Sequence, residues 1–424
     1  MRRRRSDDLP RFVKDHEPPP FHSRWRRRYG LYLVAVFFVC WILYPARSTG
    51  AADGDGAPAV KWSKYAYSLY ATDSAMLCHA VLIFDALAEY GSKADRVLFY
   101  PEYWDTAVSD SKDRDSQLLV MARDTYKVKL QPIQMLTVEG RTADEWTGTW
   151  DKTVSKLMAF TLTQYDRVIA LDSDITLLQH LDELFHLPPT PMAMPRAYWH
   201  KTKPWPLTSL LMVLQPSLDE FLHFKKLIAR GGNEALVAAH KFDLELVNER
   251  FEDSAMVLPH RPYALLSAEF RAHNHSAYLG GDSGEEAWDA KTVLEEAKLV
   301  HFNDWPLPKP WIMWPQEGLA AVQPDCGLSL LETCMERRLW KGLYEDFRKR
   351  RRDVCRLLSV PAPEWTRIQG GGGEQDQQQL ANITEGTHHE APPVPGEGEA
   401  EPEVKAASGE SENGEGERER ASPA

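Results

Sequence analysis

A short hydrophobic strand followed by two closely spaced carboxylates is the feature that most limits how this chain can fold. Arg167–Leu171 is mainly apolar, a pattern typical of a buried strand, and Asp172-Ser173-Asp174 follows at once. In extended backbone, residues two apart point to the same side, so both carboxylates converge beyond the strand's carboxyl end. Open α/β sheets bind ligands at that edge.

Two chemical interpretations of this motif are open. Paired hard oxygen donors suit Mg²⁺ or Mn²⁺, which usually bind a few protein carboxylates together with substrate phosphates. Thr176, however, completes the pattern D-x-D-x-T, which is typical of phosphatases in which the first aspartate is a nucleophile. Under that interpretation Asp172 forms a covalent intermediate and is not a metal ligand.

Strand and helix patterns alternate around the motif. Their order predicts an α/β domain with a largely parallel mixed sheet and helices on both faces. The expected strands are 65–71, 96–100, 128–133, 167–171, 207–214 and 298–302; the expected helices are 73–90, 116–126, 151–162, 217–229, 242–251 and 328–358; residues 188–206 are expected to form a proline-rich loop.

The first 46 residues indicate a membrane anchor. Residues 29–46 carry no charge, and as a helix they span about 27 Å, enough for a thin bilayer. Residues 1–28 have a net charge of +6, with four arginines just before the apolar stretch. The positive-inside rule places this basic tail in the cytoplasm and the remainder in a lumen. A cleaved signal peptide is the alternative, although the long basic leader favours the anchor.

The rest of the chain is acidic, which argues against a nucleic-acid-binding protein. Residues 370–424 have a net charge of −10 and almost no aromatic residues, so we expect disorder there. The basic run Arg348–Arg352 is either a solvated helix end or a site for a polyanionic acceptor. Beyond the apolar stretch there are four cysteines, which an oxidising compartment would allow to pair. Cys326 and Cys334 are the expected pair, and Cys78 is expected to be a buried thiol.

Several motifs together resemble glycosyltransferase family 8, the glycogenin-like enzymes, over roughly residues 60–320. The strongest match runs from Lys156 through Leu-Thr-Gln-Tyr-Asp-Arg-Val-Ile-Ala-Leu to the D-x-D, and on to Leu181-Asp-Glu-Leu-Phe185. Tyr70-Ala-Thr-Asp73, Gly91–Arg96 and the segment from His301 to Trp311 are similar to its fungal, membrane-anchored N-acetylglucosaminyltransferase branch. The resemblance implies a GT-A-type nucleotide-diphospho-sugar transferase domain.

The resemblance also implies a metal site and a donor site. Family enzymes hold Mn²⁺, or Mg²⁺, with both D-x-D carboxylates and a histidine, which here are Asp172, Asp174 and His301. The metal would neutralise the leaving UDP diphosphate of a UDP-sugar donor. Lys309 matches a family lysine that contacts the diphosphate, and Lys156 matches one near the donor sugar. Thr72, Asp73 and Ser173 match residues that bind the nucleotide donor.

The carboxylates that face the reacting sugar are implied less directly. Asp243 matches a family aspartate at the donor sugar's hydroxyl groups. Glu245 would have a secondary role, and Lys156, near the donor sugar, is the third catalytic candidate. Leu244 replaces the family's usual glutamine, and Thr208-Ser209-Leu210 replaces an asparagine-containing segment. A side-chain nucleophile at Leu244 is impossible, so retaining transfer would proceed by front-face attack. The same departures also fit a relative that binds glycan or a partner without catalysis.

The sequence therefore predicts a retaining, metal-dependent glycosyltransferase of the Golgi lumen, moving N-acetylglucosamine from a UDP-sugar to a glycan or glycoprotein acceptor. The phosphatase interpretation is disfavoured because it leaves Lys156 and the Lys309-Pro-Trp segment unexplained. Asn274 and Asn382 begin glycosylation sequons that are usable only on the lumenal side. The expected organisation is a cytoplasmic tail (1–28), an anchor (29–46), a stem (47–60), a GT-A-type domain (61–320), a helical extension (321–369) and an acidic tail (370–424).

Overall fold

The computed structural model describes residues 60–108, 113–138, 150–200, 203–230, 236, 241–280, 287–304, 309–327, 334–357 and 359–361. The expected cytoplasmic tail, the anchor, most of the stem, the acidic tail and the sequon at Asn382 lie outside these residues. No helix in the described part of the chain is both long and apolar enough to cross a membrane.

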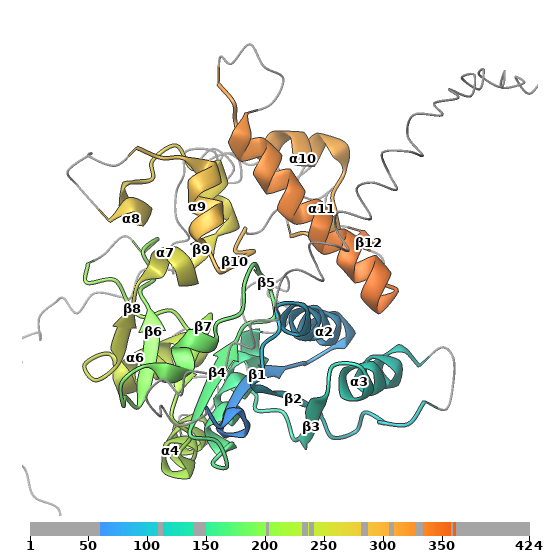
Figure 1. Cartoon of the computed structure of the whole chain (residues 1–424), viewed down its shortest axis with the longest axis vertical. Coiled ribbons are helices and arrows are strands. Elements are labelled where there is room, and N and C mark those ends of the chain that lie inside the picture. Colours follow the sequence, from blue (N-terminus) through green and yellow to red (C-terminus); the bar gives the residue numbers. More distant parts are fainter. Residues whose placement is uncertain are drawn as a thin grey trace, which may run out of the picture. The chain divides into compact units, whose positions relative to one another are not determined.

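A mixed sheet lies at the centre of the described domain (Figure 1). In spatial order its strands are β3 (Val128–Ile133), β2 (Asp95–Pro101), β1 (Tyr65–Tyr70), β4 (Arg167–Leu171), β7 (Leu211–Leu214), β6 (Met192–Pro195) and β8 (Met256–Leu258). β7 runs antiparallel to both of its neighbours, and the other described pairings in this sheet are parallel. The expected α/β domain with a largely parallel mixed sheet is confirmed.

Two smaller sheets and the helices complete the described elements. The small sheets are β5 (Ile175–Leu177), β10 (Leu299–His301) and β9 (Leu265–Leu266), and β11 (Ile312–Met313) with β12 (Val360–Pro361). The α-helices are α2 (Ser74–Glu89), α3 (Arg114–Asp124), α4 (Leu218–Arg230), α6 (Asp243–Phe251), α7 (His260–Tyr263), α8 (Ser276–Leu279), α9 (Ala290–Glu296), α10 (Gln316–Val322) and α11 (Met335–Cys355). The 3₁₀-helices are η1 (Trp62–Lys64), η3 (Trp150–Thr161), η4 (Asp182–His186) and η5 (Ser267–Arg271).

Three expected elements differ from the structure. The segment expected as an α-helix over 151–162 is the 3₁₀-helix η3. The expected loop over 188–206 contains β6, and the strand expected over 207–214 is regular only in β7. Prolines had suggested an irregular segment, but β6 is short and pairs on both sides, so the prolines sit at or beyond its ends.

Alternation along the central strands separates two hydrophobic cores. Tyr67 and Leu69 of β1 face the core beneath α2, α3 and α11, whereas Ala66 and Tyr70 face the core beneath η3, α4 and α6. β4 alternates in the same way, with Leu171 on the α2 side. Because successive strand residues point to opposite faces, the side chain of Asp172, the residue after Leu171, points toward the η3 and α6 side.

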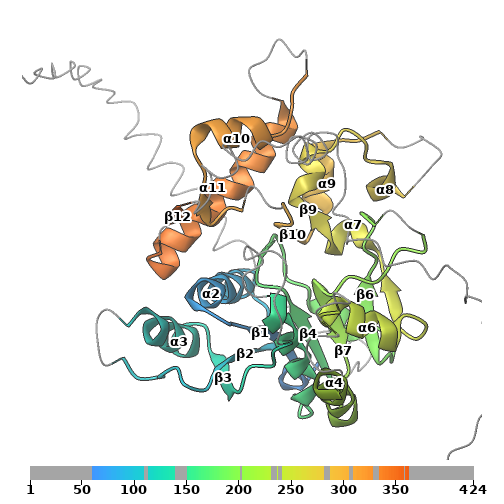
Figure 2. The same ribbon diagram turned by 180° about the vertical axis from the view of Figure 1, so that it is seen from behind.

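The long helix α11 belongs to the core of this domain. Trp340, Tyr344 and Phe347 are each at most 2% exposed and pack with residues of α2. Figures 1 and 2 show α11 lying beside α2 from opposite sides. A disulfide joins Cys78 of α2 to Cys355 at the end of α11. The expectation of a free thiol at Cys78 is therefore wrong, because its partner is 277 residues away. The pairing of Cys326 with Cys334 is confirmed.

Most of the basic run of α11 contacts protein, whereas Lys349 and Arg352 are exposed. Arg351 is 3% exposed, and its guanidinium donates to the carbonyl of Trp311. Arg348 donates to the carbonyl of Pro310, and Arg350 to that of Leu82. In this run Arg352 is exposed and pairs with its neighbour Asp353. Three of the five residues are thus turned toward protein, where they dock α11.

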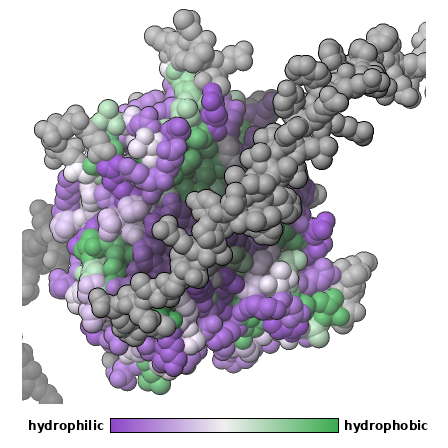
Figure 3. Space-filling view, in the orientation of Figure 1, coloured by the Kyte–Doolittle hydropathy of each residue, from purple (hydrophilic) through white to green (hydrophobic). Residues whose placement is uncertain are grey.

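The surface carries small, separate hydrophobic areas. Where described atoms are visible in Figure 3, hydrophilic residues predominate and hydrophobic ones are scattered between them. The exposed large hydrophobic side chains include Leu218 and Leu222, which lie one turn apart on α4, and Val257 of β8 and Met313 of β11 on other elements. This distribution is normal for a protein surface.

Candidate functional site

The candidate site lies where β1 and β4 end and where β10 approaches β5. β1 and β4 are parallel neighbours, so their carboxyl ends lie at the same edge. The chain then turns into β5, which pairs antiparallel with β10 and places Ile175 opposite His301. The Phe302 amide donates to the Asp174 carbonyl at 2.9 Å. Backbone pairing therefore brings His301 to the D-x-D motif over a long sequence separation.

Asp172, Asp174 and His301 form a candidate metal centre. Each offers one ligand atom, and these atoms lie within 4.8 Å of one another. His301 Nε2 is 3.2 Å from Asp174 Oδ1, while its buried Nδ1 has no hydrogen-bond partner in the described part of the chain. Two carboxylate oxygens and one imidazole nitrogen are a donor set that suits Mn²⁺ or Mg²⁺. The residues present therefore fit a divalent cation.

The two aspartates differ in their electrostatic surroundings. Burial raises the pKa of Asp172, and the nearby Asp174 and Asp243 raise it further, against the opposing effect of Lys156. Burial also opposes ionisation of Asp174, but His301 and Lys309 outweigh it and hold the pKa of Asp174 well below its usual range. Lys309 Nζ lies 3.6 Å from Asp174 Oδ2. A concentration of carboxylates at partly buried positions is what a bound cation would stabilise.

Lys156 bridges two of the predicted site carboxylates. Its side chain is 2% exposed, and Nζ lies 2.5 Å from Asp172 Oδ1 and 2.9 Å from Asp243 Oδ2. Nζ also donates to the carbonyl of Ser209 at 2.9 Å. Burial lowers the pKa of Lys156, but the two carboxylates more than compensate and raise it above the usual value. η3 thus supplies a fixed positive charge between the ends of β4 and α6.

Asp243 is part of this cluster, whereas Glu245 is turned toward its own helix. Burial raises the pKa of Asp243, but Lys156 and the hydroxyl groups of Thr153 and Ser209 lower it overall. The Glu245 carboxylate accepts the backbone amide of Phe242 at 2.9 Å, which satisfies an otherwise unpaired donor at the start of α6. The structure therefore brings Asp243 to Lys156 and gives Glu245 a helix-capping contact.

The residues expected to hold the nucleotide lie at the start of α2 and between the two aspartates. Asp73 Oδ1 accepts the amides of Ala75 and Met76 at 2.8 and 2.9 Å, so this side chain caps α2. The Thr72 hydroxyl donates to Asp73 Oδ2 at 3.2 Å. Ser173 is 6% exposed, and its hydroxyl lies 3.0 Å from the Met76 sulfur.

Sequence reasoning missed Tyr70, which stands beside Asp172. β1 and β4 are in register up to Ser68 opposite Ala170, and continuing that register places Tyr70 next to Asp172 on the same face. Burial raises the pKa of the Tyr70 phenol well above its usual value, and Asp172 and Asp243 add to this effect. The signal available in the sequence was its position at the end of the first strand, where side chains reach the ligand edge.

Sequence reasoning also missed His79, a fully buried residue of α2. Its two ring nitrogens have no hydrogen-bond partner among the described residues, and its ring centroid is 4.6 Å from that of Trp311. Burial lowers its pKa from 6.5 to about 3; Arg351 and Lys309 contribute to this, and Asp174 opposes it. In the sequence, His79 lies within the helix expected over 73–90, and no motif marks it.

We expect His79 to make the protein sensitive to mild acid. Below about pH 6.5 the unfolded chain binds a proton at His79 that the folded protein does not accept until about pH 3. Stability therefore falls as pH decreases through this window, by roughly 2 kcal/mol between pH 7 and pH 5. His79→Phe should remove this part of the dependence in urea unfolding, while His200→Gln, at an exposed position, should not. Parallel pH profiles for wild type and His79→Phe would contradict this expectation.

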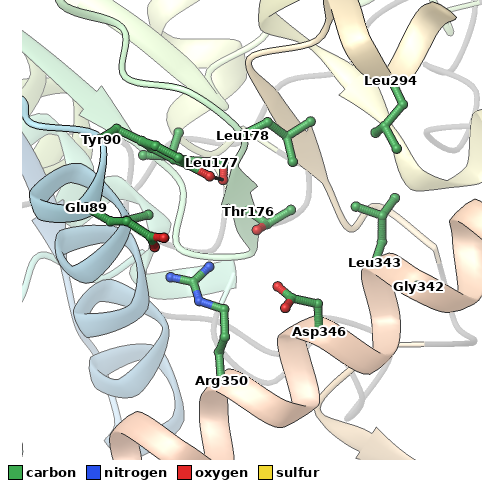
Figure 4. A pocket seen from close by; sticks show the side chains of 11 residues that line it. Glu89, Tyr90, Thr176, Leu177, Leu178, Leu294, Gly342, Leu343, Asp346 and Arg350 are labelled. Atoms are coloured by element: carbon green, nitrogen blue, oxygen red, sulfur yellow. Dashed lines mark hydrogen bonds between the residues drawn. The ribbon is translucent and has the colours of Figure 1, made fainter. Parts of the chain in front are cut away.

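Thr176, the last residue of the D-x-D-x-T pattern, lines a separate cavity of about 360 Å³. In Figure 4 Thr176 of β5 faces Asp346 and Arg350 of α11, with Leu343 and Leu294 at the other end. The metal-type cluster consists of Asp172, Asp174 and His301. With Asp172 in contact with Lys156 and Thr176 in this cavity, the arrangement gives the phosphatase interpretation no support.

Comparison with known proteins identifies fungal relatives. No family model matches the chain. A protein of Aspergillus fumigatus named glucose N-acetyltransferase 1 is 47% identical over 343 residues, which cover 78% of this chain and 86% of that protein. The protein of the same name from Gibberella zeae is 46% identical over 312 residues, covering 72% of this chain and 66% of that protein. The one from Saccharomyces cerevisiae is 25% identical over 412 residues, covering 70% and 82%.

Solved structures with some similarity are more distant. The galactosyltransferase LgtC in complex with donor and acceptor sugar analogues has a TM-score of 0.41 at 10% identity, covering 71% of this chain and 99% of that one. The glycosyltransferase GlyE of Streptococcus pneumoniae has a TM-score of 0.38 at 14% identity, covering 66% and 60%. At such scores these similarities carry no argument about the site.

Proposed function

Because the chain belongs to the family of the fungal glucose N-acetyltransferase 1 proteins and is a glycosyltransferase, we propose that it transfers N-acetylglucosamine from a UDP-sugar to a glycan acceptor. The observation that carries this proposal is the cluster of Asp172, Asp174, His301 and Lys309 at the carboxyl edge of the sheet. Three candidate metal ligands beside a lysine suit a diphosphate that needs its charge neutralised. A GT-A-type domain is the architecture we assign to it.

We propose that Asp172, Asp174 and His301 hold Mn²⁺, with Mg²⁺ as the alternative. When bound, such a cation acts as a Lewis acid at the leaving diphosphate. Lys309 would place a second positive charge at the same phosphates, because its ammonium lies 3.6 Å from Asp174 Oδ2. Thr72, Asp73 and Ser173, at the start of α2 and within the motif, would hold the nucleotide.

The role of Asp243 is to position the donor sugar. Lys156 and two hydroxyl groups hold its carboxylate, and Lys156 also contacts Asp172. A carboxylate engaged by a lysine is a weak nucleophile, and Leu244 beside it has no nucleophilic group. Both observations support retaining transfer by front-face attack, in which the leaving phosphate receives the acceptor's proton. Glu245 acts indirectly, because its capping contact fixes the start of α6 and hence Asp243.

A panel of UDP-sugars tests this proposal. Full-length protein should release UDP from UDP-N-acetylglucosamine in a Mn²⁺-dependent manner, faster than from UDP-glucose or UDP-galactose, and should yield a product with retained anomeric configuration. Turnover with another UDP-sugar would correct the donor assignment. Absence of turnover with every donor, together with intact UDP binding, would favour the alternative, a non-catalytic relative that binds glycan or a partner. The replacements at Thr208, Leu210 and Leu244 motivate that alternative.

We also propose that the protein is a single-pass type II protein of the Golgi membrane, anchored by residues 29–46, with the catalytic domain in the lumen. Exposed Asn274 then lies where glycosylation occurs, and its sequon partner Ser276 is exposed as well. In a eukaryotic host, endoglycosidase should shift the protein band, and Asn274→Gln should reduce that shift. Protease digestion of the large domain in sealed microsomes would contradict this topology.

A further inference from the structure

The segment that carries Lys309 is held from several directions. The Ile312 amide donates to the Lys309 carbonyl at 3.1 Å, which closes a turn from Lys309 to Ile312. Beyond the turn, Ile312 pairs with Val360 of β12. The Lys309 ammonium lies 5.4 Å from the centroid of the Trp311 ring, so the side chain lies along that indole. Residues 309–311 are called the lysine turn below.

Two arginines of α11 donate to carbonyl groups of the lysine turn. Arg348 Nε is 2.9 Å from the Pro310 oxygen, and Arg351 Nη1 is 3.5 Å from the Trp311 oxygen. Residues three apart lie on the same face of a helix, so both side chains reach the turn together. A guanidinium bond to a carbonyl is charge-assisted, and Arg351 is almost completely buried.

Aromatic rings hold the turn between α2 and α11. The Trp311 ring centroid is 4.6 Å from that of His79 on α2 and 5.8 Å from that of Phe347 on α11. The Cys78–Cys355 disulfide joins the same two helices. Lys309 lies on a short turn outside regular secondary structure, so these contacts are what hold the turn in place. Groups that must be placed accurately require such support from neighbouring side chains.

We propose that Arg348 and Arg351 are positioning residues that hold the lysine turn so that the Lys309 ammonium stays beside Asp174, where the donor diphosphate binds. This inference rests on the proposed function. It makes α11 part of the donor site, and it gives Arg348 and Arg351 a role other than acceptor binding. Displacing a group by about 1 Å can cost up to a hundredfold in activity, so loss of either contact is expected to be measurable.

Affinity for UDP, measured calorimetrically on the full-length protein with Mn²⁺, is the primary test. Arg348→Ala should weaken UDP binding by about tenfold, because Lys309 is no longer held at the diphosphate. Arg348→Gln, whose amide can still donate to the Pro310 carbonyl, should recover part of the affinity. Arg352→Ala is the matched control, since this exposed residue of the same run pairs with Asp353, and its UDP affinity should equal that of wild type.

A double-mutant cycle separates positioning from general stabilisation. If Arg348 acts through Lys309, Arg348→Ala should cause no further loss of UDP affinity in a Lys309→Ala background. Equal losses in both backgrounds, or wild-type affinity in Arg348→Ala, would overturn the inference and leave the proposed function intact. If Arg348→Ala does not fold, Arg348→Gln replaces it in the cycle and is judged by the same outcomes. Failure of wild type and Arg352→Ala to bind UDP would overturn the proposed function, and with it this inference.

Discussion

Asp174→Asn should abolish Mn²⁺-dependent turnover while leaving the fold intact. The substitution removes a negative charge that faces both His301 and Lys309, and the proposed metal site would lose one of its three candidate ligands. Losing several kcal/mol of charge stabilisation at the leaving group corresponds to a rate decrease of about a thousandfold or more. Asp172→Asn should have a similar effect on turnover. Its fold should also stay intact, because Asp243 still pairs with Lys156 and preserves the surrounding structure.

Steady-state UDP release with and without EDTA measures this effect, and circular dichroism checks the fold. Asp166→Asn is the matched control, because Asp166 lies six residues before Asp172 but is 62% exposed and pairs with Lys64. That variant should keep wild-type rates. Full activity of wild type in EDTA would refute the metal assignment. A phosphoaspartate trapped on Asp172 would instead revive the phosphatase interpretation.

Replacing Lys156 should cause the largest loss of stability in the site. Lys156→Met leaves Asp172 and Asp243 as neighbouring, poorly solvated carboxylates without their shared cation. Removing one partner from a buried ion pair typically costs about 3–5 kcal/mol of unfolding free energy. Turnover should also fall by at least about a hundredfold, because the cluster that we propose to position the donor sugar is lost. Urea unfolding and UDP release measure the two effects separately.

The stability of Lys156→Met relative to wild type should depend on pH in a definite direction. Without the ammonium, the pKa values of Asp172 and Asp243 rise, because Lys156 lowers both. The folded variant then binds protons more readily than its unfolded chain, so its stability relative to wild type should recover as pH falls. A double variant with Asp243→Asn should regain stability but not turnover. Lys64→Met, at an exposed ion pair, is the control. Equal stability of Lys156→Met and wild type at pH 7 would show that the bridge contributes little.

Local sequence patterns predicted most of the secondary structure around the site. The apolar run of β4 and the apolar spacing of α2 depend on residues close together, so their patterns predict structure directly. The structure brings the D-x-D motif and His301 together, and only the family resemblance had linked positions so far apart in the sequence. Helix type in η3 and the short strand β6 were missed, because both depend on packing against distant elements.

The sequence by itself determined the alternation of strands and helices, the D-x-D motif at a strand end and the acidic balance of the chain, because these depend on residues close together. Tertiary structure alone decided what each charge touches. Lys156 meets Asp243, 87 residues away, and Cys78 meets Cys355, 277 residues away. The arginines of α11 likewise resemble a solvated basic run until packing turns Arg348 and Arg351 onto the lysine turn. A charged side chain has no local period that reveals its partner, so only the folded arrangement of α2, α11 and the sheet edge could assign these contacts.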